Sequence, residues 1–425
     1  MQLILRQGRI VDPSQKLNKT MDIGIEDGRI AEIAPKIRKK GRKEIDARKL
    51  TVLPGFIDMH THLREPGRED AETIESGTNA AARGGFTGVA CMPNTQPVND
   101  SEAVTAFILE RAREVSKIAV YPVGAITKGS QGKNLAEIGE MYRTGIVAIS
   151  DDGHAVQDSQ VMRRAMEYSR IFNLLVIDHC EDKELAAGGV MHEGYYSTML
   201  GLRGMNPAAE EIQVVRDALL AAQTGARVHI AHISTRRSLE AVVRARKQDK
   251  VAITCEVTPH HLLLTDAAVS AYDTNTKMNP PLRSQDDVDA LVQGIASGDI
   301  DAIATDHAPH NINDKMLEFD RASFGIVGLE TAVGLICDRF VRTGIITLER
   351  LAQLFSANPA RILNLERGTL AKGAWADITV LDLELNHEVH AAEFLSRSCN
   401  TPFEGWKLQG GPVMTIVKGK VVWSI

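Results

Sequence analysis

The middle of the chain repeats one pattern, and this pattern constrains the fold more than any other feature. Between about residues 54 and 366, short apolar runs typical of buried strands alternate with longer stretches whose apolar residues recur at helical spacing. The apolar runs cover residues 55–58, 86–92, 118–123, 146–150, 174–178, 227–231, 251–256 and 301–305. The clearest helical stretches are 72–83, 102–114, 159–170, 207–224 and 284–297. Strands and helices in this alternation predict an α/β fold, a (β/α)8 TIM-like barrel.

Both ends of the chain have a different, β-rich pattern. Within residues 22–30, short β-prone runs flank an Asp27-Gly28 turn, which is a hairpin signal. Residues 377–382 and 414–423 return to the same style. We therefore expect one small β-sandwich domain built from residues 1–53 and 367–425, beside a barrel domain of residues 54–366.

Composition excludes several classes of protein. The 49 basic and 55 acidic residues give a net charge of -6 without a long basic block, so nucleic acid is not an expected partner. No apolar run approaches the roughly 18 residues of a membrane span, and the first six residues resemble a strand rather than a signal peptide. Five widely spaced cysteines indicate reduced thiols. We expect a soluble cytoplasmic protein without a membrane partner.

Residues of metal-binding type follow several of the predicted strands. His60 and His62 follow the first strand, and side chains two positions apart in extended chain point to the same side. His179, His232 and Asp306 follow the fifth, sixth and eighth strands. A single histidine of this kind is more often a hydrogen-bonded core residue. Five such residues at the strand ends, which meet at one mouth of a barrel, together favour a metal centre.

A centre with two metal ions needs an anionic ligand between them, because cations about 3.5 to 4 Å apart repel each other. The fourth strand ends in Asp151-Asp152-Gly153 and offers such a carboxylate. We prefer Asp152 as the bridging ligand and keep Asp151 as the alternative. Both aspartates could instead cap the next helix or form a turn.

With these motifs in place, the chain resembles the cyclic amidohydrolases, and among them the bacterial type I dihydroorotases. The resemblance runs essentially from end to end. Its most specific stretches are PGFIDMHTHLREPG at 54–67, MPNT at 92–95, KMNPPLR at 277–283 and ATDHAPH at 304–310. It implies the reversible cyclisation of N-carbamoyl-L-aspartate to (S)-dihydroorotate in pyrimidine biosynthesis.

The resemblance also implies two Zn²⁺ ions per subunit. By it, His60 and His62 bind one ion, His179 and His232 bind the other, and Asp152 bridges them. Asp306 contacts metal and acts as the catalytic base. Many relatives bridge their metals with a carbamylated lysine on the fourth strand, whereas this chain has the aspartate pair there.

The implied substrate contacts are Arg64, Asn94, Asn279, His310, Phe324 and Gly325. Arg64 stands two residues after His62, and its guanidinium offers a bidentate fork to a substrate carboxylate. Hydantoinases and allantoinases lack an arginine at this place, so Arg64 favours a dihydroorotase. For Asn94 and Asn279, a purely local role in turns is the alternative.

Two other functions remain open at this stage. The chain could be another cyclic amidohydrolase, such as an allantoinase or a dihydropyrimidinase. It could also be a non-catalytic dihydroorotase-like partner of aspartate transcarbamoylase, although such proteins lose metal ligands and this chain has the full set. The resemblance further suggests a homo-oligomer and aspartate transcarbamoylase as a partner. The polar segment 311–323 is either a lid over the substrate or an ordinary surface loop.

Overall fold

A parallel barrel forms the centre of the protein. The computed structural model describes residues 1–425. The eight barrel strands are β6 (Phe56–Thr61), β7 (Phe86–Cys91), β8 (Ala119–Gly124), β9 (Ala148–Ile149), β10 (Leu175–Asp178), β13 (Arg227–Ile230), β14 (Ile253–Val257) and β15 (Ala302–Ile303). Each pairs in parallel with the next, and a parallel bridge between Thr61 and His307 joins the two ends of the sheet. The predicted barrel and its eight strands are confirmed.

Alternation of apolar side chains along the strands explains the two layers of the core. On β7, Val89 and Cys91 belong to a cluster of 62 buried residues shared with the surrounding helices, whereas Ala90 belongs to a cluster of 14 with residues such as Leu175 and Ala302. Successive residues of a strand face opposite sides, so the larger cluster lies outside the strands and the smaller one fills the barrel. The barrel is therefore a packed core that leaves only its mouth for chemistry.

The five predicted helical stretches are all helices. They are α1 (Ile74–Arg83), α2 (Glu102–Val115), α4 (Ser159–Ser169), α7 (Ala208–Thr224) and α10 (Gln285–Ser297). Thr73, Asp158 and Ser284 accept hydrogen bonds from backbone N–H groups in the first turns of α1, α4 and α10. The other helices are α3 (Ile138–Thr144), α5 (Lys183–Ala186), α6 (Tyr195–Leu200), α8 (Arg236–Lys247), α9 (Pro259–Leu263), α11 (Ile312–Lys315), α12 (Ala332–Ile336), α13 (Leu348–Ala352) and α14 (Asn358–Ile362).

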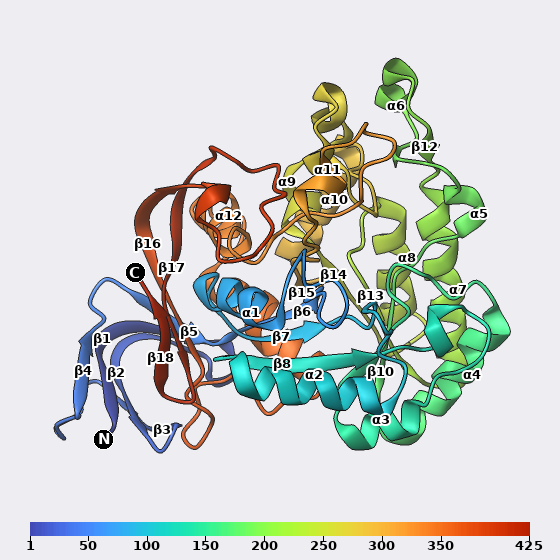
Figure 1. Cartoon of the computed structure of the whole chain (residues 1–425). Coiled ribbons are helices and arrows are strands. Elements are labelled where there is room, and N and C mark those ends of the chain that lie inside the picture. Colours follow the sequence, from blue (N-terminus) through green and yellow to red (C-terminus); the bar gives the residue numbers. More distant parts are fainter.

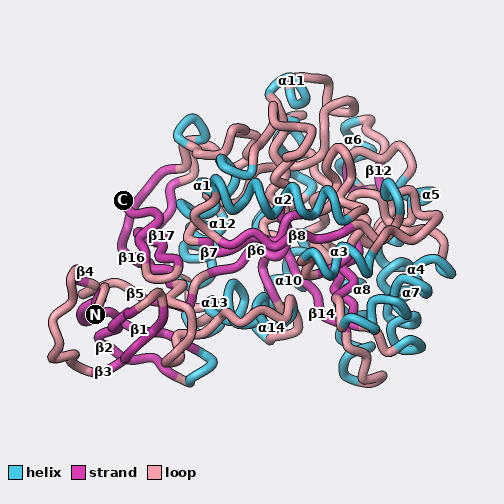
Figure 2. Tube along the Cα trace, turned by 60° about the horizontal axis from the view of Figure 1, so that its bottom comes forward, coloured by secondary structure: helices cyan, strands magenta, loops and turns pink.

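Strands from both termini form one further sheet on the side of the barrel, where both chain ends lie (Figures 1 and 2). Its members are β1 (Leu3–Asp12), β2 (Leu17–Glu26), β3 (Arg29–Ala34), β4 (Lys43–Asp46), β5 (Thr51–Pro54), β16 (Ile378–Glu388), β17 (Lys407–Val417) and β18 (Lys420–Ser424). Antiparallel pairing of β5 with β16 joins the two termini. The predicted hairpin turn also forms, with positive φ at Asp27 and Gly28.

The segments above the barrel mouth are irregular. They contain α5, α6, α9, α11 and the short parallel pair β11 (Met191–His192) and β12 (Gly204–Met205); α6 projects at the top of Figure 1, and α11 lies at the top of Figure 2. The loops around α11, at residues 306–310 and 323–325, supply part of the lining of the cavity described below. Nowhere in the structure is a helix both long enough and apolar enough to cross a membrane.

Candidate metal centre and substrate cavity

The predicted metal ligands come together at the mouth of the barrel. Nε2 of His60 lies 3.2 Å from Oδ1 of Asp152, and Nε2 of His62 lies 3.0 Å from Oδ1 of Asp306. Nδ1 of His179 lies 3.0 Å from Nε2 of His232. Two atoms bound to one tetrahedral zinc ion lie about 3.3 Å apart, because each bond is about 2.0 to 2.2 Å long. The three separations thus match the spacing of ligand atoms around shared metal ions.

Asp152 occupies the centre of this group. Its Oδ1 lies 3.7 Å from Nε2 of His232 and 3.9 Å from Nδ1 of His179, and its Oδ2 lies 3.5 Å from Nε2 of His62. Burial alone would raise the pKa of Asp152, but the surrounding imidazoles, His60 first among them, hold that pKa well below its usual value. The side chain is therefore a carboxylate, the form that bridges cations.

The side chain of Asp151 points away from the histidines and binds the neighbouring backbone. Its Oδ1 accepts hydrogen bonds from the backbone N–H groups of Ile126 at 2.8 Å and Thr127 at 3.0 Å, and its Oδ2 accepts from the Thr127 hydroxyl. These bonds tie the end of β9 to the segment after β8. Of the two aspartates, Asp152 is the one that the fold places among the histidines.

The residues present fit a metal. Nε2 of His60 and Oδ1 of Asp152 are buried without a hydrogen-bond partner, although buried polar atoms are normally paired. Two triads have their ligand atoms within 4.8 Å of one another: His60, Asp152 and His232, and His60, His62 and Asp306. Imidazole and carboxylate donors are a ligand set that suits zinc and other divalent transition metals.

Backbone strain coincides with this centre. His232 has a φ of 30°, Asp306 a φ of 46° and Arg64 a φ of 59°. Residues other than glycine rarely adopt positive φ, and such strain concentrates at functional sites. Each residue lies two or three positions after the end of a barrel strand, so the turn out of the strand directs its side chain toward the mouth.

A cavity of about 410 Å³ opens over the candidate centre, a volume suited to a small molecule. Its lining includes five of the six predicted metal ligands and all six predicted substrate contacts; His60 lies beneath it. The substrate group is Arg64, Asn94, Asn279, His310, Phe324 and Gly325. The structure thus brings together side chains that are spread over more than 260 positions of the sequence.

Two of the cavity's polar side chains are held by neighbouring groups. Nε of Arg64 donates to the carbonyl of Pro309 at 3.1 Å, and burial lowers the pKa of Arg64 only to about 10, so it remains a cation at neutral pH. Nε2 of His310 donates to the carbonyl of Phe324 at 2.7 Å. Burial, with the Arg64 charge, lowers the pKa of His310 to about 3, so this ring is neutral.

The two asparagines connect the cavity to residues near the metal centre. Oδ1 of Asn94 accepts from Nδ1 of His62 at 2.8 Å, which leaves Nε2 of His62 facing Asp306. Nδ2 of Asn279 donates to Oε2 of Glu181 at 2.6 Å. Both amides are therefore oriented by side chains close to the metal ligands, in addition to any role in local turns.

Sequence reasoning missed Glu181 and Glu256. Glu181 stands two residues after His179, a spacing that could have drawn attention to it. Glu256, which is 1% exposed, lies within β14, and its Oε1 lies 3.0 Å from Nδ1 of His60. A single glutamate inside an apolar strand was the available signal, because a charged residue there needs a partner.

Two further buried histidines near the mouth, His261 and His307, bond to other parts of the chain. Nε2 of His261 lies 3.0 Å from the carbonyl of Pro280, and Nε2 of His307 lies 3.2 Å from Oε2 of Glu72. Neither belongs to the close-packed ligand triads. Their contacts stabilise the segments that carry Asn279 and Asp306.

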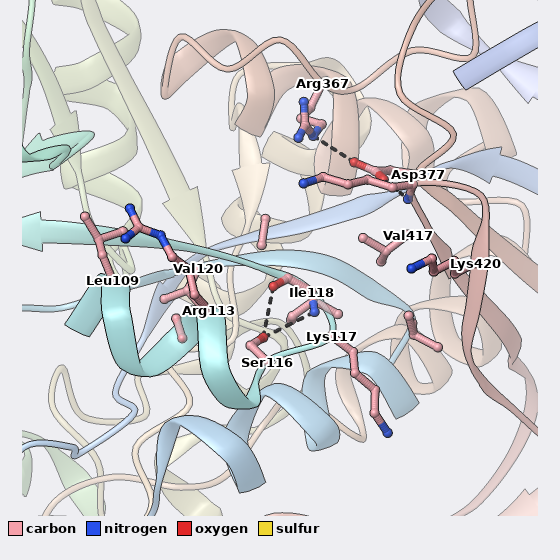
Figure 3. Close-up of a pocket in the computed structure, with 14 residues that line it drawn as sticks. Leu109, Arg113, Ser116, Lys117, Ile118, Val120, Arg367, Asp377, Val417 and Lys420 are labelled. Atoms are coloured by element: carbon pink, nitrogen blue, oxygen red, sulfur yellow. Dashed lines mark hydrogen bonds and ion pairs between the residues drawn. The ribbon is translucent and has the colours of Figure 1, made fainter. Parts of the chain in front are cut away.

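A larger cleft of about 550 Å³ lies at the junction of α2, β8 and the β17–β18 hairpin (Figure 3). Its walls combine apolar residues with exposed basic side chains, and its one carboxylate, Asp377, pairs with Arg367 at 2.7 Å. It contains no histidine and no group of metal-ligand type beyond that pair. The smaller cavity at the barrel mouth is therefore the candidate site.

Known proteins are similar to this chain along its full length. A family model described as "Dihydro-orotase-like" matches residues 49–238, and one described as "Amidohydrolase family" matches residues 203–423. Dihydroorotases from Solibacter usitatus and Pelotomaculum thermopropionicum are 51% and 52% identical to the chain, over 100% and 99% of its length and 98% of theirs. The chain belongs to the dihydroorotase family.

Solved structures of related hydrolases share the fold of this dihydroorotase-family chain. An L-hydantoinase from Arthrobacter aurescens superposes with a TM-score of 0.90 at 25% identity, covering 100% of this chain and 96% of that one. A D-hydantoinase from Thermus sp. gives 0.87 at 25% identity, with coverages of 99% and 95%. The predicted barrel with a small β domain from both termini is confirmed, as is the predicted class, a hydrolase of cyclic amides.

Proposed function

We propose that this dihydroorotase catalyses the reversible cyclisation of N-carbamoyl-L-aspartate to (S)-dihydroorotate and water, in pyrimidine biosynthesis. The observation that carries the proposal is the single cavity in which a cluster of metal ligands faces the Arg64 guanidinium. A metal held by this cluster would activate the carbonyl in an amide-forming reaction. The Arg64 guanidinium would bind the second carboxylate of the substrate. The identity of about one half to dihydroorotases favours this reaction over those of hydantoinases, which are 25% identical.

The metal centre is proposed to hold two Zn²⁺ ions. His60 and His62 would bind one ion, His179 and His232 the other, and Asp152 both, with Asp306 as a further ligand on the His60 and His62 side. Bound zinc supplies a Lewis acid for the reacting carbonyl and lowers the pKa of water. The buried, unpartnered Nε2 of His60 and Oδ1 of Asp152 support this assignment, as does the 3.0 Å approach of Nδ1 of His179 to Nε2 of His232.

Asp306 is proposed as the catalytic base. In the direction of ring closure, the carbamoyl nitrogen forms a bond to the side-chain carboxyl carbon, a C–O bond of that carboxyl breaks, and water leaves. Asp306 takes the proton from the nitrogen and delivers it to the departing oxygen, which takes a second proton from solvent, because the carboxyl is ionised at neutral pH, and so leaves as water; in ring opening Asp306 returns the proton to the nitrogen. Asp306 lines the cavity, and its histidine neighbours, opposing burial, keep the pKa of its carboxyl below the usual value, so the group is ionised and free to accept a proton.

The remaining cavity residues are proposed to orient the substrate. Arg64 would pair with the carboxylate that stays free in the ring, with Asn94 and His310 beside it. Asn279, Phe324 and Gly325 would contact the ring and its carbonyl groups. Holding the reacting nitrogen against the carboxyl carbon removes much of the entropic barrier to cyclisation.

Assembly is proposed from the family and from the surface. We expect a homo-oligomer and an association with aspartate transcarbamoylase, whose product would be the substrate here. Exposed apolar side chains on the segments above the mouth support a protein partner at this end: Tyr195 and Met199 on α6 are 73% and 53% exposed, and Ile312 on α11 is 60% exposed. All five cysteines are free, which fits the expected cytoplasm.

Turnover of dihydroorotate and of N-carbamoyl-L-aspartate by zinc-loaded protein tests the proposal, with allantoin, hydantoin and a chelated sample as controls. Metal-dependent conversion of the first two compounds alone is the expected result. Equal turnover of hydantoin or allantoin would contradict the substrate assignment. Absence of turnover, with zinc bound and aspartate transcarbamoylase added, would contradict the catalytic proposal.

A further inference from the structure

A series of buried polar side chains in mutual contact lies inside the barrel, beneath the candidate metal centre. It starts at Thr254 on β14, whose Oγ1 lies 2.7 Å from Nδ1 of His229 on β13. Nε2 of His229 lies 3.2 Å from Oε2 of Glu256, and Oε1 of Glu256 lies 3.0 Å from Nδ1 of His60. His229, Glu256 and His60 are each at most 1% exposed. This series of contacts thus ends at the ring of His60, a proposed zinc ligand.

Glu256 has no other function in the fold. Its two side-chain oxygens have no hydrogen-bond or ion-pair partner other than the two histidines, and it caps no helix and pairs with no lysine or arginine. A carboxylate buried inside a barrel costs several kcal/mol unless its partners compensate, on the order of the desolvation of a single ion. An apolar residue would fill this position at less cost, so the histidine contacts are the reason for the glutamate.

The contact decides which nitrogen of His60 carries the proton. A carboxylate only accepts hydrogen bonds, so Nδ1 of His60 must donate to Glu256. When a metal takes the place of the proton on Nε2, the one N–H left on the imidazole is at Nδ1, and Nε2 offers its lone pair to the metal. That nitrogen is buried without a hydrogen-bond partner and lies 3.2 Å from Asp152. The ring therefore presents a ready metal-binding atom toward the mouth.

His229 holds Glu256 in turn. It packs on the side of the carboxylate opposite His60, and Thr254 orients its ring. β6, β13 and β14 all belong to the barrel wall, so the carboxylate cannot turn away from His60 without also leaving the 3.2 Å contact with His229. The fold thus supports the His60 ring from behind.

We propose that Glu256, held by His229, is a positioning residue that fixes the Nδ1–H tautomer and ring orientation of His60 and so raises the zinc affinity of the centre. The proposal rests on the metal site proposed above, in the part that concerns His60. Hydrogen-bonded carboxylates behind ligating histidines typically change metal affinity by about 10- to 100-fold.

The first measurement is the zinc dissociation constant, from competition with a chromophoric chelator. Glu256→Leu removes the acceptor at similar volume and is expected to weaken zinc binding about 100-fold; Glu256→Gln keeps an acceptor but not the charge and is expected to weaken it about tenfold. Glu330→Gln is the matched control, because Glu330 is a buried carboxylate that accepts from the backbone N–H groups of Leu395 and Ser396 and touches no proposed ligand. Its zinc affinity should stay within twofold of the wild type.

The second measurement is the tautomer of His60 in metal-free protein, at a pH high enough to leave the ring neutral, from nitrogen chemical shifts of ¹⁵N-labelled histidine, with His60→Asn for assignment. Wild type and Glu256→Gln should show the Nδ1–H form, and Glu256→Leu a mixture. Unchanged zinc affinity in a folded Glu256→Leu, or in Glu256→Gln if the first variant does not fold, would overturn the proposal. An unchanged tautomer in Glu256→Leu would do the same. Failure of the wild type to bind zinc would instead overturn the metal centre itself, while the tautomer would still report on Glu256.

Discussion

Nδ2 of Asn279 donates a 2.6 Å hydrogen bond to Oε2 of Glu181, two residues after the proposed ligand His179. The bond fixes which face of the amide looks into the cavity. Glu181→Ala frees the amide, so we expect KM for dihydroorotate to rise about tenfold, the cost of one charge-assisted hydrogen bond of about 1.5 kcal/mol. Steady-state kinetics measures this.

Zinc content separates this effect from one on the metal centre. Nε2 of His179 lies 3.7 Å from Glu181, which is too far for a hydrogen bond, so Glu181→Ala should bind as much zinc as the wild type. Glu181→Gln keeps an acceptor for the amide, so its KM should lie between those of Glu181→Ala and the wild type. A loss of zinc in Glu181→Ala would show that this residue acts through His179 instead.

Arg64 should dominate recognition of the substrate carboxylate. It is a cation at the cavity wall, and truncation of a buried charge-paired residue costs about 2 to 5 kcal/mol. Arg64→Met should therefore lower kcat/KM for dihydroorotate by about 100-fold or more. Arg64→Lys should retain a kcat/KM between those of Arg64→Met and the wild type, since an ammonium group cannot form two parallel hydrogen bonds as the planar guanidinium does. Kinetics within threefold of the wild type for a folded Arg64→Met would contradict this role.

Lys315 holds together the segments that carry the proposed ring contacts. It is 5% exposed, and its Nζ donates to the carbonyls of Ser323 at 2.8 Å, Gly325 at 3.0 Å and Lys277 at 3.4 Å. Lys315→Met keeps the volume but frees three carbonyls. We expect KM to rise about tenfold and the loop to open, at a cost of about 1 to 3 kcal/mol.

Limited trypsin digestion measures this opening. Cleavage after Arg321, which is exposed in the loop, should be faster in Lys315→Met than in the wild type. Lys372→Met, at an exposed lysine of the small β domain, is the control and should leave both KM and cleavage unchanged. Equal digestion rates for all three proteins would contradict the proposal that the Lys315 hydrogen bonds hold the loop closed.

The strands and the mouth of the barrel were predictable because each depends on local sequence. Apolar runs locate β6 to β15, and histidines just after such runs must lie at the mouth. The partners of those histidines were not predictable. The contact of Glu256 with His60 joins residues 196 positions apart and depends on strand register and rotamers, which periodicity does not encode. The choice between Asp151 and Asp152 likewise depends on which carboxylate the backbone of Thr127 binds.

The small β domain should show a pH dependence that originates at Asp22. This side chain is 1% exposed and accepts 2.9 Å hydrogen bonds from the backbone N–H groups of Ile37 and Gln7 and from Arg6. Burial would raise the pKa of Asp22, but these bonds outweigh it and lower the pKa to about 2. A carboxyl whose pKa is lower in the folded state than in the unfolded chain stabilises the fold above the unfolded pKa. That contribution is lost as the pH falls toward the folded value.

Asp22→Asn removes this contribution, so we expect the variant to be less stable than the wild type by about 2 kcal/mol at pH 7. The difference should shrink by about 1 kcal/mol between pH 6 and pH 3, where the unfolded wild type takes up a proton that the folded protein does not. Urea unfolding of both proteins across this range measures it. Asp27→Asn, at the exposed turn of the same sheet, is the control and should differ little from the wild type at any pH. A gap between wild type and Asp22→Asn that stays constant from pH 6 to pH 3 would mean that the hydrogen bonds do not depend on the charge of Asp22.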